Sequence, residues 1–126
     1  TPYHFHYSKM EDIINRGGGD LMIQVYNATE AYRLADTPVK VDVDGCRSTV
    51  PAGTILRLRP GESISLPTYM YHQFWAEGAP VLSGEVSAVN DDNVDNHFLE
   101  EVGRFPKIEE DEPPLYLLCN EYPPAP

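Results

Sequence analysis

The stretch 4–11 reads His4-Phe5-His6-Tyr7-Ser8-Lys9-Met10-Glu11 and restricts the fold more than any other part of the chain. Residues 1–9 alternate as a short strand does. Two histidines at positions i and i+2 of a strand point to the same face, about 6–7 Å apart, so both imidazoles can reach one ion. Glu11 lies just past this strand, where the chain can turn back and offer a carboxylate. The stretch therefore predicts part of a metal site.

His72 is the fourth candidate ligand, and it lies far along the chain. It follows Gly61, Pro67 and Tyr71, and we expect it on a second strand opposite the first. Three imidazoles and one carboxylate form a mixed nitrogen and oxygen site, which suits manganese, iron, cobalt, nickel or zinc. Four protein ligands leave two positions of an octahedral ion open, which favours a catalytic site over a closed structural one. The His-x-His pair alone is weak, because most histidines bind no metal.

Short strands and turns dominate the rest of the chain. Val39, Val41 and Val43 alternate with charged residues up to a turn signal at 44–45, which predicts a half-buried strand. Further strands are predicted at 20–27, 54–58, 63–66, 73–75 and 81–89. Residues 11–16 are predicted as a helical turn or a bend that the three glycines at 17–19 end. With 12 prolines and 9 glycines, the pattern indicates an all-β sandwich or barrel with little helix.

The size and charge of the chain limit its partners. We expect one domain over residues 1–126. The formal net charge of −11 disfavours binding to nucleic acid or to an anionic membrane surface. The sequence has no apolar run long enough to cross a membrane, and we expect no signal peptide. Cys46 and Cys119 are expected to be reduced thiols of a cytoplasmic protein.

Two spaced motifs resemble those of the cupin superfamily. They are His4-x-His6-x4-Glu11-x6-Gly18 and Gly61-x5-Pro67-x4-His72, in the expected order. The resemblance implies a cupin, or jelly-roll, β-barrel with one metal ion on His4, His6, Glu11 and His72. The chain departs from the motifs at Tyr69, where glycine is common, and at Ala76, where asparagine is common. The glycine that usually precedes the first histidine is also missing.

Longer blocks of sequence carry a closer resemblance. They are residues 4–7 with Lys9, 11–19, 58–64, 71–77, 84–87, 89–93 with 95–96, 110–113 and 118–122. These blocks are similar to the D-lyxose isomerase family, whose members carry extra residues before the His-x-His strand. The resemblance implies an aldose–ketose isomerase that depends on Mn²⁺, with Co²⁺, Fe²⁺, Ni²⁺ or Zn²⁺ as alternatives. It would interconvert D-lyxose and D-xylulose, with D-mannose and D-fructose as a second pair.

Such an isomerase moves a proton between C1 and C2 of the sugar through an enediol, and it needs a base. Glu85 is the preferred base, because it alternates with Ser83 and Ser87 on a polar strand face while Leu82 and Val86 point away. A solvent-facing glutamate on an edge strand is the alternative. Lys9 could donate a proton to a sugar oxygen or help to open the ring; a surface lysine is the alternative.

The residues expected to bind the sugar are less strongly marked. The polar segment 90–96, with Asp91 and Asp95, offers groups for sugar hydroxyls, although it could equally be a plain loop. Trp75 could stack on a sugar ring, with core packing favoured instead. Arg104 is a candidate for closing over the site. His97 is interpreted as incidental, since four ligands suffice.

Three other functions fit the same ligand set. A cupin-type sugar-phosphate isomerase would need a cluster of basic residues, and the chain offers only Arg57-x-Arg59. An iron-dependent cupin dioxygenase and a non-catalytic sugar-binding cupin remain as alternatives. A small monosaccharide is the expected ligand. The resemblance also suggests a homodimer formed through exposed strand edges.

Overall fold

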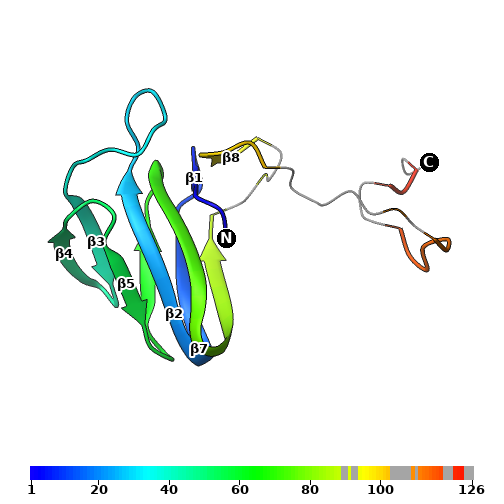
Figure 1. The fold of residues 1–126 in the computed structure, drawn as a ribbon, viewed down its shortest axis with the longest axis horizontal. Coiled ribbons are helices and arrows are strands. Elements are labelled where there is room, and N and C mark those ends of the chain that lie inside the picture. The colour runs from blue at the N-terminus through cyan, green and yellow to red at the C-terminus, as the bar shows by residue number, and fades with distance from the viewer. Residues whose placement is uncertain (89–90, 92–93, 103–108, 110, 118–120, 124–126) are drawn as a thin grey trace.

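A long two-stranded ribbon forms the centre of the computed structural model, which describes residues 1–88, 91, 94–102, 109, 111–117 and 121–123. Strands β2 (Glu11–Asn27) and β7 (Met70–Ser87) pair antiparallel over nearly their whole length. Figure 1 shows both strands bending back together at the lower end of the ribbon. The pairing register shifts twice at this bend, between Asn15 and Gly17 and between Gly18 and Asp20.

The bend is sharp enough to bring the two ends of β2 together. Val25 is paired with His72, and Glu11 lies 14 residues away along the same strand. A straight strand would separate those positions by about 45 Å. Instead, an oxygen of the Glu11 carboxylate lies 3.1 Å from a ring nitrogen of His72. The ribbon is therefore folded over on itself, so that its two halves face each other.

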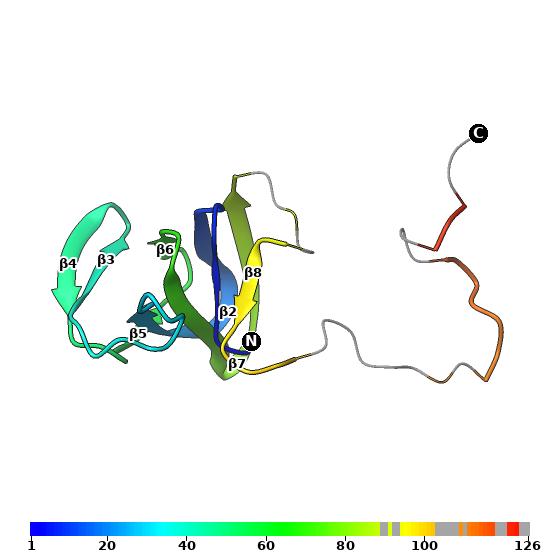
Figure 2. The ribbon, with the colours of Figure 1, turned by 90° about the horizontal axis from the view of Figure 1, so that it is seen from above.

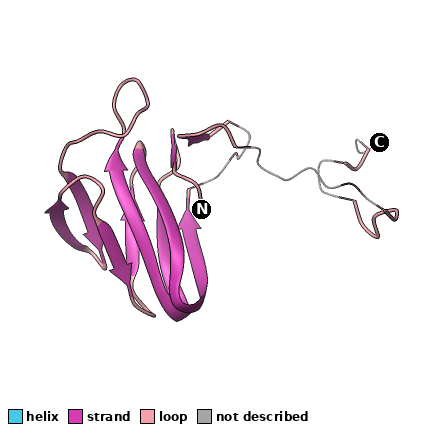
Figure 3. Ribbon diagram, in the orientation of Figure 1, coloured by secondary structure: helices cyan, strands magenta, loops and turns pink. Residues whose placement is uncertain are grey.

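Six shorter strands extend the two halves of the ribbon. They pair in the order β4-β3-β6-β2-β7-β1-β8, and β5 pairs with the second half of β2. Every pairing is antiparallel, and no helix occurs in the ranges described, which confirms the predicted all-β fold (Figure 3). The sheet is not closed into a barrel there, because β4 and β8 are its two ends, as Figure 2 shows from above. The six strands are β1 (His4–His6), β3 (Val39–Val43), β4 (Cys46–Val50), β5 (Ile55–Leu58), β6 (Ser63–Leu66) and β8 (Asn96–Phe98).

The hydrophobic core lies between the two halves of the folded ribbon. Alternate residues of β2 point inward, with Ile13 on the first half and Ile23 and Val25 on the second. β3 and β6 cover them with side chains that are almost wholly inaccessible to water. Burial of such side chains contributes about 1.5–3 kcal/mol each. The other members of this cluster are Leu21, Val39, Val41, Leu58, Ile64, Leu66 and Met70.

Glycines 17–19 give the bend its shape, and here the sequence prediction was wrong. Residues 11–16 form a strand rather than a helical turn, and the glycines continue that strand instead of ending it. A Cβ atom at Gly18 would overlap the carbonyl oxygen of Pro80, and one at Gly19 would overlap that of Glu77. The two backbones therefore approach closely only because no side chain is present. The two strands predicted at 73–75 and 81–89 are parts of one strand, β7, which ends at Ser87.

A cluster of aromatic rings covers one face of β1, the face that carries Phe5 and not His4 and His6. Phe5 is fully buried there, with ring centroids 4.9 Å from Tyr71 and 4.9 Å from His97. Tyr69 also contacts Phe5, at 5.2 Å. The packing of this cluster holds β1 against the start of β7. It therefore also holds in place the strand that carries His4 and His6.

The described residues 111–117 lie apart from the sheet. Residues 111–117 are exposed and distant from the strands in both views (Figures 1 and 2). Among the residues with a described position, none belongs to a helix that is long and apolar enough to cross a membrane.

Candidate metal centre

Four predicted ligands meet where the two ends of the folded ribbon come together. His4 and His6 lie on the inner face of β1, and His4 is paired with His72 on β7. Glu11 opens the first half of β2 and reaches them from the facing side. The four ligand atoms all lie within 4.8 Å of one another, so one ion could contact all of them.

The hydrogen bonds of the histidines leave their ring nitrogens suited to metal binding. Nδ1 of His72 lies 3.0 Å from the carbonyl oxygen of Met70, and Nδ1 of His4 lies 3.0 Å from that of Pro2. A carbonyl oxygen only accepts, so each Nδ1 carries the proton and each Nε2 presents a lone pair, as in typical metal-binding histidines. Both ring nitrogens of His6 and Nε2 of His72 are buried without a hydrogen bond. These unsatisfied buried atoms fit a site that an ion completes.

The electrostatics of the cluster also favour metal ligation. Burial, with a smaller contribution from the adjacent His72 imidazole, lowers the pKa of His4 from 6.5 to about 4, which keeps the His4 imidazole in the neutral, ligating form. Burial works to raise the pKa of Glu11, but the adjacent imidazoles of His6 and His72 and the Lys9 ammonium outweigh burial and hold this pKa below its usual range. Glu11 is therefore a carboxylate although it is 3% exposed.

Lys9 lies between two carboxylates beside the four ligands. Its ammonium nitrogen is 2.9 Å from an oxygen of Glu11 and 3.0 Å from an oxygen of Glu85. Burial alone would lower the pKa of Lys9, but the two carboxylates outweigh burial and raise this pKa. With one ammonium and two carboxylates, the three groups carry a net charge of −1, which an added cation would offset.

Glu85 lies at the rim of this cluster. It is paired with Ile13, and Ser83 and Ser87 are likewise paired with inward-facing residues of β2, so all three share the inner face. Leu82 and Val86 point outward and are exposed, which confirms the alternation predicted for this strand. The side chain of Glu85 is 44% exposed, in contrast to Lys9 at 4%. Glu85 is thus the carboxylate of the group that a molecule arriving from solvent would reach.

Tyr69 shows how the chain tolerates a departure from the expected motif. Its φ angle is 58°, in the left-handed region that glycine adopts without strain. Its backbone N–H donates to the carbonyl of His6 at 3.1 Å, and its carbonyl accepts from Ala28 at 2.9 Å. These two bonds, together with the ring contact to Phe5, hold Tyr69 in that conformation and keep the start of β7 beside β1.

The carboxylate of Asp95 is hydrogen-bonded to the turn between β1 and β2. Its carboxylate accepts hydrogen bonds from the backbone of Ser8 and Lys9 and from the Ser8 hydroxyl. Nothing in the spacing of the sequence connects Asp95 with Lys9, 86 residues away. Burial works to raise the pKa of Asp95, but these hydrogen bonds outweigh burial and lower this pKa.

The remaining predicted residues lie away from the four ligands or outside the described residues. Trp75 is paired with Met22 on the face of β7 opposite His72, and at 37% exposed it is not packed in the core as predicted. Asp91 is exposed, and its carbonyl oxygen accepts a hydrogen bond from the backbone N–H of Asp95 at 2.9 Å. Arg104, like residues 89–90, 92–93 and Cys119, lies outside the part of the chain that the structure describes.

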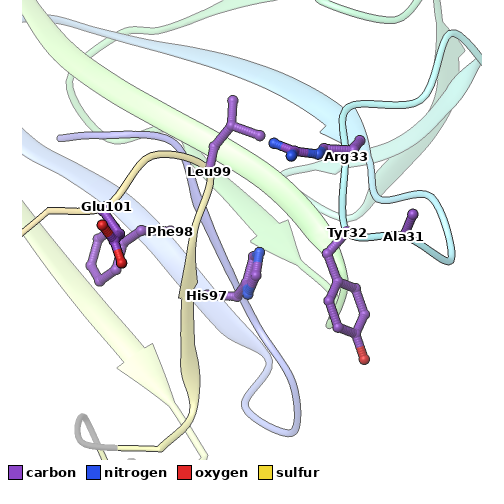
Figure 4. Close-up of a pocket in the computed structure, with 7 residues that line it drawn as sticks. All are labelled: Ala31, Tyr32, Arg33, His97, Phe98, Leu99 and Glu101. Atoms are coloured by element: carbon purple, nitrogen blue, oxygen red, sulfur yellow. The ribbon is translucent and has the colours of Figure 1, made fainter.

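His97 belongs to the aromatic cluster rather than to the metal ligands. Its Nδ1 lies 2.9 Å from the hydroxyl of Tyr7, and its ring stacks on Phe5. A shallow pocket of about 280 Å³ opens beside it, with Tyr32 and Arg33 on the other side (Figure 4). Sequence spacing gave no signal for this arrangement.

Comparison with known proteins adds to this geometry. A family model described as D-lyxose isomerase matches residues 1–122. The chain is 57% identical over 124 residues to a D-lyxose/D-mannose isomerase of Serratia proteamaculans, which covers 97% of this chain and 54% of that protein. It is 56% identical over 124 residues to a D-lyxose/D-mannose isomerase of Escherichia coli O157:H7, with 97% and 55% covered. The chain spans about half the length of these curated relatives.

Proposed function

This chain belongs to the D-lyxose isomerase family, and from that premise we propose that it interconverts D-lyxose with D-xylulose and D-mannose with D-fructose. One observation carries the proposal beyond the family name. Four ligand atoms within 4.8 Å of one another lie directly beside a charged Lys9–Glu85 pair. Moving a proton between two carbons of a sugar needs both kinds of group, since one stabilises charge and the other transfers the proton.

We assign His4, His6, Glu11 and His72 as the ligands of a divalent ion, with Mn²⁺ as the proposed metal and Co²⁺, Fe²⁺, Ni²⁺ or Zn²⁺ as alternatives. The lone pairs on Nε2 of His4 and His72 and the carboxylate of Glu11 support this assignment. When bound, such an ion would act as a Lewis acid that stabilises negative charge on neighbouring sugar oxygens.

The proton transfer is assigned to Glu85 and Lys9. In the direction from aldose to ketose, the C2–H bond breaks and the Glu85 carboxylate takes the proton. The same carboxyl group then delivers it to C1. The Lys9 ammonium donates a hydrogen bond to O1, where negative charge develops, and the proton of the O2 hydroxyl passes to O1 as the C2=O bond forms. The 44% exposure of Glu85 and the raised pKa of Lys9 support these roles, because the base must be reachable and the donor must stay charged.

Three further assignments are part of the proposal. Asp91, which is exposed, is assigned to sugar hydroxyls. A homodimer is proposed, supported by the strand edge of β7 that pairs with β1 only at His72. A cytoplasmic location is proposed, supported by the free, exposed thiol of Cys46.

The test is conversion of D-lyxose to D-xylulose followed by NMR in D₂O, with the chain first stripped of metal and then given Mn²⁺. We expect activity only with metal. His72→Ala should lose both Mn²⁺ binding and turnover. Glu85→Gln should keep Mn²⁺ binding and lose exchange of the C2 proton with solvent, by about 10²-fold or more.

Two results would contradict this assignment. Full turnover after chelation would exclude the metal role of the four ligands. Unchanged C2 exchange in Glu85→Gln would exclude Glu85 as the base. Consumption of O₂ in place of isomerisation would instead support an iron-dependent oxygenase.

A further inference from the structure

Asp95 forms an unusually complete clamp around the turn that carries Lys9. Its Oδ1 accepts hydrogen bonds from the Ser8 backbone at 2.8 Å and from the Ser8 hydroxyl at 2.7 Å. Its Oδ2 accepts one from the Lys9 backbone at 3.0 Å, and its own carbonyl accepts one from Tyr7 at 3.2 Å. With a side chain that is 5% exposed, Asp95 thus holds three consecutive residues of the turn.

The clamp is itself fixed on both sides. On one side, the backbone N–H groups of Val94 and Asp95 donate to the carbonyl oxygen of Asp91 at 3.2 Å and 2.9 Å. On the other side, Asn96 begins β8 and is paired with His6 on β1. Asp95 therefore moves with the strand that carries two of the metal ligands.

Fixing the backbone of Lys9 has a direct effect on its side chain. The ammonium group contacts Glu11 at 2.9 Å and Glu85 at 3.0 Å, and both contacts need the Cα atom of Lys9 in one place. A lysine has four rotatable side-chain bonds, so a mobile backbone would let the ammonium leave either carboxylate. The three charge-assisted hydrogen bonds to Asp95 prevent that movement.

We propose that Asp95 is a positioning residue for Lys9 rather than a ligand of the sugar. Both of its carboxylate oxygens are engaged by the turn, and it acts through Lys9 without touching the reacting atoms. The part of this inference that concerns turnover rests on the proposed isomerase function. The part that concerns the placement of Lys9 does not, and it is measured separately.

The first readout needs no activity. Lys9 is buried, so its ammonium should react slowly with formaldehyde and cyanoborohydride in the whole chain, while the exposed Lys40 reacts fast and serves as an internal reference. Asp95→Asn replaces one of the two acceptor oxygens with an NH2 group, which donates and cannot accept, so the three donors of the turn can no longer all be satisfied. We expect labelling of Lys9 relative to Lys40 to rise about tenfold, the effect of losing hydrogen bonds to a charged group.

A matched variant removes only part of the clamp. Ser8→Ala deletes the hydroxyl bond at 2.7 Å and leaves both backbone bonds to Asp95. Its labelling should rise by about two- to fourfold, less than in Asp95→Asn. If Asp95→Asn does not fold, the labelling of Lys9 relative to Lys40 is compared between Ser8→Ala and the unmodified chain.

The second readout is the kinetics of D-lyxose conversion with Mn²⁺. A positioning role predicts that kcat falls about tenfold or more in Asp95→Asn while KM changes by less than about twofold. A large rise in KM with kcat retained would overturn the inference and make Asp95 a sugar ligand. Unchanged Lys9 labelling in both variants would also overturn it. If Lys9 is labelled faster in Asp95→Asn while the unmodified chain shows no isomerase activity, the result would support the positioning role of Asp95 and contradict the proposed function.

Discussion

Replacing Lys9 by methionine tests the charge balance of the site directly. The substitution keeps an unbranched side chain of similar length and removes the ammonium. Glu11, 3% exposed and 2.9 Å from that ammonium, would then keep its buried negative charge without its lysine partner. Glu85 would lose its partner as well, but its side chain is 44% exposed, so water would screen its charge.

These exposures determine the size of the effect. Breaking a buried ion pair from one side costs about 3–5 kcal/mol. The half-exposed contact with Glu85 adds less than about 1 kcal/mol. Methionine retains most of the packing of the lysine stem, which recovers part of the loss. We therefore expect Lys9→Met to lower the free energy of unfolding of the metal-free chain by about 3–4 kcal/mol.

Urea unfolding of the chelated chain measures this loss, with Lys40→Met as the control because Lys40 is exposed on β3. Lys9→Met changes the charge of the three-residue group from −1 to −2, so Mn²⁺ should stabilise this variant more than it stabilises the unmodified chain. A loss within about 0.5 kcal/mol of the control would refute the view that Glu11 depends on a desolvated partner. If Mn²⁺ raises the free energy of unfolding equally in Lys9→Met and in the unmodified chain, the assigned position of the cation is refuted.

Two further predictions concern the bend and the pH dependence. Gly19→Ala should destabilise the chain by about 3 kcal/mol or more, because its methyl group would overlap the carbonyl of Glu77, whereas Gly84→Ala meets only the flexible side chain of Arg16 at 3.3 Å and should cost less than about 1 kcal/mol. Equal losses in urea unfolding would contradict this. The metal-free chain should lose stability as the pH falls from 6.5 to about 4, because the unfolded chain binds a proton on His4 that the folded chain, with its lowered pKa, does not. An NMR titration of the His4 ring with a midpoint near 6.5 would contradict it.

Several of the short strands were accessible from sequence, because each of those carries its own signals. The alternation of Val39, Val41 and Val43 predicts β3 with its observed bounds, and Pro67 stops β6 where predicted. Strand β4 (Cys46–Val50) was missed, since its burial pattern is almost wholly exposed and its residues alternate weakly. A strand with no buried face has no alternation of apolar and polar residues that the sequence could reveal.

The folded ribbon was not accessible from sequence. Three glycines in a row are typical of a break, and locally they do favour one. Here the backbone of Gly18 and Gly19 passes against the backbone of Pro80 and Glu77 in β7. The reason for the glycines lies in a partner strand about 60 residues away, which no local pattern contains. Tertiary contact therefore overrides the local preference.

The site was partly predictable for a similar reason. The i, i+2 spacing places His4 and His6 on one face of β1, and that follows from strand geometry alone. The approach of His72 depends on the cupin-type resemblance, because spacing does not say which strands pair. The role assigned to Asp95 depends on a contact across 86 residues, and a loop of polar residues offered no hint of it.

The two ends of the folded ribbon are stabilised by different means. At the bend, glycines allow the backbones to touch, and next to them the apolar core fills the interior. At the open end the interior holds His6, Lys9, Glu11 and His72 instead, all buried. Polar groups in that number stabilise a fold only when each is satisfied, and several ring nitrogens there make no hydrogen bond with the described protein atoms. A cation held between Glu11 on one half and the histidines on the other would join the halves at the end that the core does not reach.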